Sequence, residues 1–218
     1  MKRIIKILHV INSLTGGGAE KQCLLLAKSQ AQFGHIVYIA LNKKRETNED
    51  IGGVSIFYLG GYSRYNIFLW INLLKSITKI NPDITQSWLP NMDILTGILC
   101  FFTKKKYIMT ERSTEEAYVT KNHRDFRNKD VKITYNSNSY KMYIDGIFRY
   151  FAAANASFIV ANSLSGVDYW KKKFPRKKIC KINNILSDQL KIDPNNKEEK
   201  IERNYSFFVI GSLENHKS

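Results

Sequence analysis

Short apolar runs alternate with longer segments of helical periodicity along most of the chain. The runs are four to eight residues long, which is the usual length of a strand. They predict strands at 4–11, 35–41, 54–59, 83–89, 107–110, 157–161 and 178–185. The longer segments predict helices at 20–33, 65–80, 92–102, 140–154 and 164–174.

Strands of mostly apolar residues that alternate with helices are typical of a parallel sheet with helices on both faces. The predicted fold class is therefore α/β, with a Rossmann-like parallel sheet. Sheets of this kind bind ligands at the carboxyl ends of their strands.

The pattern also predicts how the chain is divided. Residues 1–186 form one domain, and within it the polar stretch 113–139 is predicted to be a long loop. Residues 187–204 are rich in Asn, Lys and Glu and are expected to form a linker. Residues 205–218 then open a strand that cannot bury its own faces. We interpret it as the first strand of a second domain that is absent from the sequence.

Three consecutive glycines, Gly16, Gly17 and Gly18, connect the first strand to the first helix. Glycine lets a backbone approach a ligand closely, and the N-terminus of the following helix offers free N–H groups and a positive dipole end. The loop therefore predicts a phosphate site, with a tight turn as the alternative.

The chain carries 34 Lys and Arg against 19 Asp and Glu, a net charge of +15. This balance favours anionic partners, although a lysine-rich solvated surface is the alternative. No helix-turn-helix, RRM or zinc pattern supports a nucleic-acid partner.

Cys23, Cys100 and Cys180 lie far apart and form no CxxC pair, which suits a reducing, cytoplasmic compartment. We expect each of them to be buried. His9, His35 and His123 show no metal-ligand spacing, and we expect His9 to be a buried, hydrogen-bonded histidine.

Five segments, in order, resemble those of family 4 glycosyltransferases, which have the GT-B fold. The first is 8–20 (LHVINSLTGGGAE), followed by 82–89 (PDITQSWL) and 110–113 (TERS). The others are 159–163 (IVANS) and 208–217 (FVIGSLENHK), where the last resembles the start of the family's second Rossmann-like domain. The chain therefore looks like the N-terminal half of a GT-B fold.

The resemblance implies a retaining transferase that moves a sugar from a nucleotide-sugar to an acceptor, without a cofactor or a bound metal. The N-terminal domain would hold the acceptor, and the C-terminal domain would hold most of the donor. The expected role is surface polysaccharide or glycolipid assembly. We expect this chain alone to be catalytically silent. The alternative is a non-catalytic, acceptor-binding scaffold subunit that pairs with a separate donor-binding protein.

The resemblance also implies residue roles. Gly16, Gly17 and Gly18 would face the donor diphosphate, as would Lys217, whereas Ser212 replaces an arginine that the family usually carries. Glu20 lies in the first turn of the predicted helix, where it suits the helix dipole better than acid catalysis.

Arg112 stands where relatives carry a His or Arg that contacts the reacting sugar or acceptor. An arginine can hold a phosphate or hydroxyl but cannot accept a proton. The alternative is an ion pair with Glu111 or Glu115. Glu111 is a weaker candidate for the acceptor site, with the same ion pair as its alternative.

Trp88 and Asn91 flank the end of the fourth strand, and an aromatic face beside an amide suits a sugar acceptor. The alternatives are core packing for Trp88 and helix N-capping for Asn91.

The densest basic cluster comprises 171–173 and 176–178 and surrounds Trp170, Phe174 and Pro175. Because family acceptors are often lipid-linked, this cluster predicts peripheral contact with an anionic membrane; a solvated helix end is the alternative.

Overall fold

The computed structural model describes residues 3–15, 17–43, 51–61, 65–112 and 139–184. They belong to a compact unit, Met1–Ile185, and the second unit, Leu186–Ser218, lies outside the described residues. The predictions of a loop at 113–139, a linker at 187–204 and a further strand at 205–218 therefore concern residues outside this description, except that Ser139 begins a helix.

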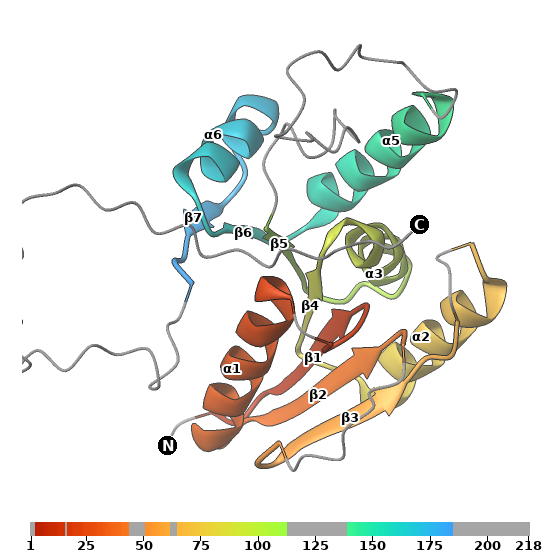
Figure 1. Ribbon diagram of the computed structural model, residues 1–218, viewed down its shortest axis with the longest axis vertical. Coiled ribbons are helices and arrows are strands. Elements are labelled where there is room, and N and C mark those ends of the chain that lie inside the picture. Colours follow the sequence, from red (N-terminus) through yellow and green to blue (C-terminus); the bar gives the residue numbers. More distant parts are fainter. Residues whose placement is uncertain (1–2, 16, 44–50, 62–64, 113–138, 185–218) are drawn as a thin grey trace, which may run out of the picture. The chain divides into compact units, whose positions relative to one another are not determined.

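Seven parallel strands form one sheet in the order β3-β2-β1-β4-β5-β6-β7 (Figure 1). The strands are β1 (Lys6–Ile11), β2 (Ile36–Leu41), β3 (Val54–Tyr58), β4 (Ile84–Trp88), β5 (Tyr107–Glu111), β6 (Phe158–Ala161) and β7 (Ile179–Lys181). This sheet confirms the predicted α/β class, because every predicted apolar run of the domain became a strand.

Five described helices pack against the sheet: α1 (Gly18–Gln32), α2 (Ile67–Ile80), α3 (Pro90–Phe102), α5 (Ser139–Asn155) and α6 (Leu164–Lys173). Helix α1 lies on one side of β1 and β2, and α2, α3 and α5 lie on the other side (Figure 1). None of the described helices is long and apolar enough to cross a membrane.

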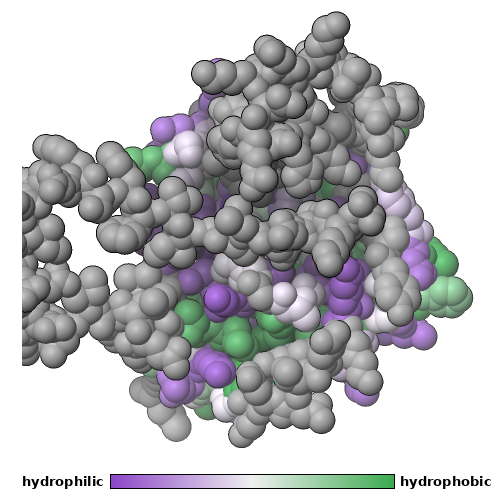
Figure 2. Space-filling view, in the orientation of Figure 1, coloured by the Kyte–Doolittle hydropathy of each residue, from purple (hydrophilic) through white to green (hydrophobic). Residues whose placement is uncertain are grey.

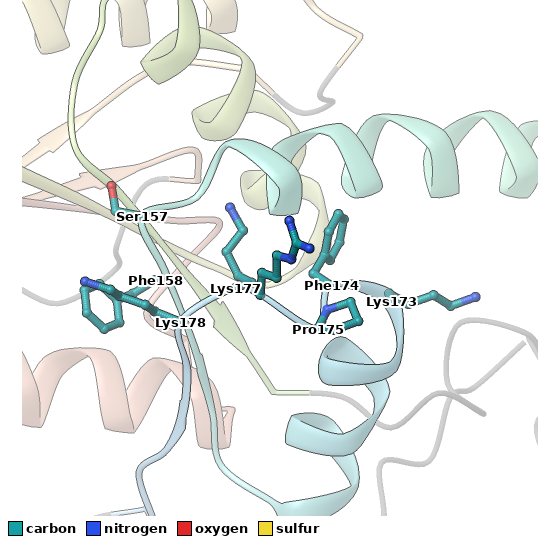
Figure 3. Close-up of a pocket in the computed structure, with 8 residues that line it drawn as sticks. Ser157, Phe158, Lys173, Phe174, Pro175, Lys177 and Lys178 are labelled. Atoms are coloured by element: carbon teal, nitrogen blue, oxygen red, sulfur yellow. The ribbon is translucent and has the colours of Figure 1, made fainter.

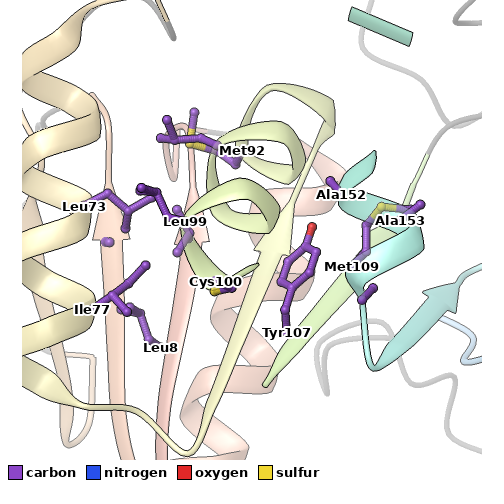
Figure 4. Close-up of a cluster of buried hydrophobic side chains, with 14 of the residues drawn as sticks. Leu8, Leu73, Ile77, Met92, Leu99, Cys100, Tyr107, Met109, Ala152 and Ala153 are labelled. Carbon is purple, nitrogen blue, oxygen red and sulfur yellow. The ribbon is translucent and has the colours of Figure 1, made fainter. Parts of the chain in front are cut away.

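Two hydrophobic clusters fill the spaces between these layers. The larger one joins α2, α3, α5 and α6 to the sheet. It includes Leu73, Leu99 and Tyr107 (Figure 4). Trp170 of α6 belongs to it as well. The smaller one lies under α1 and contains Cys23, Ala27, Trp88 and several residues of β1 and β2. Of the three cysteines, Cys23 and Cys100 are buried as expected, whereas Cys180 is half-buried.

In the larger cluster, α3 packs directly against α5 at Gly97. A Cβ on Gly97 would come within 2.8 Å of the Cα of Ala152 and 3.1 Å of Tyr107 Cε1. Glycine at this position therefore lets the two helices approach, and α5 is held close to the ends of β4 and β5.

The surface in the view of Figure 2 is mixed in character, with hydrophobic residues gathered in a patch among hydrophilic ones.

Parallel pairing brings the carboxyl ends of the strands to one edge of the sheet. Val10 is paired with Ser87, Trp88 with Thr110, and Glu111 with Ala161. The segments that follow β1, β4 and β5 therefore start side by side, and the N-terminus of α1 lies at the same edge. We call this edge the carboxyl edge and the opposite one the amino edge.

Candidate functional site

The glycine segment leads directly into α1 at the carboxyl edge. Gly17 is the N-cap residue, with φ −82° and ψ 166°, and Gly18 is the first helical residue. Gly17 is half-buried and Gly18 is exposed, and a Cβ on Gly18 would meet nothing within 4 Å. Gly16 lies outside the described residues. The described part of the segment is thus accessible, as a phosphate site requires.

The Glu20 carboxylate lies against this segment. A Cβ on Gly17 would overlap Glu20 Oε2, and Ser13 Oγ donates a hydrogen bond of 3.3 Å to Glu20 Oε1. A carboxylate in the first turn of a helix interacts favourably with the helix dipole, as we expected for this residue. A phosphate bound to the same backbone amides would share the helix terminus with this carboxylate.

Arg112 follows β5 and reaches across the carboxyl edge. Its guanidinium carbon lies 4.7 Å from the centre of the Trp88 ring, and Nη1 donates a hydrogen bond to Asn184 Oδ1. The half-buried side chain leaves its Nε atom buried with no hydrogen-bond partner in the structure. Burial lowers the pKa of Arg112 from its ordinary value, but an arginine stays charged at neutral pH.

Arg112 also lies near the first turns of α1. Its charge, together with that of Glu20, acts on the pKa of buried Cys23, which burial raises well above its ordinary value. The structure therefore places Arg112 near Glu20 and the N-terminal part of α1, while the roles of Arg112 and the glycines as site residues stay predictions.

Trp88 is completely buried beneath Arg112 and belongs to the smaller hydrophobic cluster. Its indole N–H donates a 3.1 Å hydrogen bond to His9 Nδ1, and His9 Nε2 lies 2.7 Å from Gln30 Oε1. Because an indole N–H only donates, His9 Nδ1 must accept, and Nε2–H donates to Gln30.

This geometry supports the packing interpretation of Trp88 and gives no support to direct contact with an acceptor. His9 is buried and hydrogen-bonded, as expected, and burial lowers its pKa to about 4.

Glu111 points to the other face of β5, as neighbours in a strand do. Its Oε2 accepts hydrogen bonds from Arg149 Nη2 at 2.9 Å and from Trp170 Nε1 at 2.7 Å. The expected alternative, an ion pair with Arg112, is therefore wrong: the partner is Arg149 on α5. Glu111 is only 1 % exposed, so its acceptor-binding role stays a prediction without support from its position.

Arg149 joins Glu111 to a second buried carboxylate. Asp93 Oδ2 accepts hydrogen bonds of 3.2 Å and 3.1 Å from Arg149 Nε and Nη2. Asp93 Oδ1 accepts one of 2.5 Å from Ser87 Oγ, which also lies 2.7 Å from Tyr107 Oη. Burial raises the pKa of Asp93 to about 7 despite the Arg149 charge. We call these residues the Arg149 network.

Asn91 was expected to contact an acceptor or to cap α3. It is the second residue of α3 and is exposed, whereas the N-cap residue is Leu89, which has φ 73° and no side-chain capping hydrogen bond. The capping interpretation is therefore wrong, because Pro90 already begins the helix. The acceptor-binding role of Asn91 stays a prediction, and Lys217 lies outside the described residues.

Two residues of this edge were missed in the sequence. Asn184 lies inside the strand predicted at 178–185, but β7 ends at Lys181, so no local signal marked Asn184 as a residue after a carboxyl end. Arg149 interrupts an otherwise apolar stretch of α5, which is the usual sign of a charge that is paired inside a protein. In the described part of the chain, no three His, Cys, Asp or Glu side chains come together as a metal site would require.

A parallel α/β sheet with helices on both faces defines a Rossmann-like domain. The model of Glycosyltransferase Family 4 matches residues 16–189, and the chain belongs to this family. No curated protein sequence gave a significant match.

Solved structures show the same fold. They include Anabaena Alr3699/HepE in complex with UDP-glucose, with TM-score 0.59, 14% identity and coverage of 83% of this chain and 44% of that one. A glycosyltransferase from Rickettsia africae has TM-score 0.52, 19% identity and coverage of 88% and 47%. A UDP-N-acetylglucosamine 2-epimerase has TM-score 0.53, 14% identity and coverage of 84% and 49%.

This chain thus spans less than half the length of each of these three proteins. Since transferases and an epimerase share the fold, the family match identifies the chain more specifically than the fold does.

Proposed function

We propose that the chain takes part in the retaining transfer of a sugar from a nucleotide-sugar to a lipid-linked glycan acceptor. Family membership supports glycosyl transfer in general. Proteins of the same fold were solved with UDP and with UDP-glucose, which supports a nucleotide-sugar donor. In this proposal the described domain holds the acceptor and contributes one wall of the donor-phosphate site.

One observation carries the proposal: Arg112 lies over Trp88 at the carboxyl edge, with its Nε buried and unpartnered, near the N-terminus of α1. Negative charge builds up on the nucleotide diphosphate as the glycosidic bond breaks. The Arg112 guanidinium and the backbone N–H groups of Gly17 and Gly18 would stabilise that charge without rearranging.

Arg112 has a binding role in this scheme and no role in proton transfer. Because a guanidinium keeps its protons, the donor phosphate itself would take the proton of the acceptor hydroxyl. We expect no metal or cofactor to be needed, and we expect the chain to act in the cytoplasm at the inner face of a membrane.

The 218-residue chain alone is expected to bind donors weakly and to transfer no sugar, since most donor contacts in the proposed enzyme lie outside the described domain. Isothermal titration with UDP-glucose, UDP-N-acetylglucosamine and GDP-mannose tests this expectation. We expect millimolar binding of at least one donor, and its loss in Arg112→Ala. Micromolar binding would contradict the expected weakness, and donor binding that is unchanged in Arg112→Ala would contradict the site.

A further inference from the structure

A pocket of about 700 Å³ lies at the amino edge, away from the site described above (Figure 3). Ser157 and Phe158 contribute the start of β6, and Lys178 directly precedes β7. The rest of the lining comes from the end of α6 and the turn after it, including Phe174. The pocket therefore lies between β6, β7 and the end of α6, at the edge of the sheet where these strands begin.

The charge of this pocket has a single sign. Its eight lining residues, all in the described part of the chain, include four basic side chains and no acidic one. Lys177 donates hydrogen bonds to the carbonyl oxygens of Ala154 and Ala156, so it stabilises the end of α5, and burial lowers its pKa. Lys173, Arg176 and Lys178 are exposed.

Aromatic and apolar groups lie among these cations. Phe158 is 40% exposed, and the Lys178 ammonium lies 5.4 Å from the centre of its ring. Phe174 is half-buried against Tyr150, with ring centres 4.4 Å apart, and Pro175 is exposed. Cations beside partly exposed rings are typical of surfaces that lie at a membrane interface.

Helix α3 ends at the same edge and adds further exposed aromatic and basic residues to it. Phe101 and Phe102 close α3 and are 49% and 73% exposed. Lys104 and Lys106 follow, both exposed, before β5 begins. The amino edge between β5 and β7 thus presents a series of lysines and rings.

We propose that this pocket binds the phosphate of an anionic lipid headgroup, so that the amino edge docks on an anionic membrane. The inference rests on the proposed function, in which the acceptor is lipid-linked, and it assigns the membrane contact to a defined pocket. Charge complementarity supports this occupant, because each Lys or Arg near an anionic bilayer strengthens binding and the rings suit the headgroup region.

The proposal separates membrane docking from sugar transfer. The pocket lies where β6 and β7 begin, whereas Gly17 and Arg112 lie where β1 and β5 end. Substitutions in one region should therefore leave the other unchanged.

Flotation of the full 218-residue chain with lipid vesicles tests the proposal. Vesicles contain phosphatidylcholine alone or with about 30% phosphatidylglycerol, at low and high salt. We expect the chain to bind the vesicles that contain phosphatidylglycerol and not those of phosphatidylcholine, and we expect high salt to weaken this binding. The triple variant Lys173→Gln, Arg176→Gln, Lys178→Gln should bind about 100-fold more weakly. Lys177 is left intact because it stabilises the end of α5.

The matched control removes three exposed lysines elsewhere, in Lys21→Gln, Lys43→Gln, Lys75→Gln. It should retain vesicle binding within about threefold, since distant surface charges are largely screened. Equal losses of vesicle binding in the two triple variants would overturn the pocket as the binding site, because net charge alone would then explain the binding. No vesicle binding by the wild-type chain, or binding of inorganic pyrophosphate at the pocket without vesicle binding, would overturn membrane docking.

Arg112→Ala separates this proposal from the function. It should bind vesicles as the wild type does, whereas its donor binding is lost. If no nucleotide-sugar binds to any variant but the vesicle result holds, the transferase proposal fails and the membrane site stands.

Discussion

Two arginines lie on opposite faces of β5 and differ in what they can still bind. Arg149 is 6% exposed, and its hydrogen bonds reach two buried carboxylates, Asp93 and Glu111. Arg112 is half-buried, contacts a neutral ring and an amide, and keeps an unpartnered Nε. The comparison shows that Arg149 is paired with carboxylates and holds α5 to the sheet, whereas Arg112 has no carboxylate partner among the described residues, as the proposed phosphate site requires.

The largest expected effect concerns stability. Arg149→Met should destabilise the domain by about 3–5 kcal/mol, because it leaves two buried carboxylates without their counter-charge. Arg112→Met should change stability by less than about 1 kcal/mol, since it loses mainly a cation–π contact. Urea unfolding followed by circular dichroism measures both. Similar losses in the two variants would break the distinction between the arginines.

A second test removes the support beneath Arg112. Trp88→Phe should cost about 1–3 kcal/mol, because His9 Nδ1 then remains buried without its donor. Trp70→Phe is the matched control, since Trp70 is only partly buried on α2. Urea unfolding of the two variants gives the comparison, and a cost at Trp70 equal to that at Trp88 would contradict the role of His9.

Asp93 in the Arg149 network and His9 beneath Arg112 should make the stability of the domain depend on pH in opposite directions. The pKa of Asp93 is raised to about 7, so the folded protein binds the proton more tightly than the unfolded chain. The stability from this group is therefore present at low pH and is lost as pH rises toward 7. The pKa of His9 is lowered to about 4, so its contribution is present above about pH 6.5 and is lost as pH falls toward 4.

Asp93→Asn and His9→Gln separate these contributions. Unfolding free energies between pH 4 and 8 should show a slope difference from wild type of up to about 1.4 kcal/mol per pH unit, with opposite signs for the two variants. Parallel curves for wild type and Asp93→Asn would show that Asp93 keeps its ordinary pKa.

The smallest effect on stability is expected at the glycine segment. Gly18→Ala should change stability by less than about 1 kcal/mol, because a Cβ there meets nothing within 4 Å. It should nevertheless weaken UDP binding, because the methyl group would stand where the phosphate approaches. Gly146→Ala on α5 is the control, as its Cβ also meets nothing within 4 Å. Equal UDP binding by both variants would place the phosphate elsewhere.

Much of the fold was predictable because strand and helix periodicity are local properties of the sequence. The apolar runs predicted all seven strands of the described sheet, and a glycine with positive φ, Gly34 at 85°, stands just after α1, where such a residue commonly ends a helix. The partners of Glu111 were not predictable in this way. Arg149 lies 38 residues from Glu111 and 56 from Asp93, and only the packed helices bring them together.

Local pattern also predicted where the candidate residues lie in the fold, whereas their roles stay predictions. The position of Arg112 at a strand end followed from local pattern, and so did that of the glycines. Trp88 donates a hydrogen bond to His9, which is 79 residues away, so local pattern could not decide between core packing and sugar contact for Trp88. Membrane contact at the basic cluster and the roles of Asn91 and Lys217 stay predictions.

The most direct test of the account follows the indole N–H resonances of the three tryptophans while UDP is titrated into the chain. Trp88 lies under Arg112, the indole N–H of Trp170 donates a hydrogen bond to Glu111, and Trp70 is on α2. We predict that UDP shifts the Trp88 resonance in a saturable way and leaves Trp70 unchanged, and that Arg112→Ala abolishes the shift. A Trp88 resonance that does not move while UDP binds would contradict the claim that Arg112 forms part of the donor site.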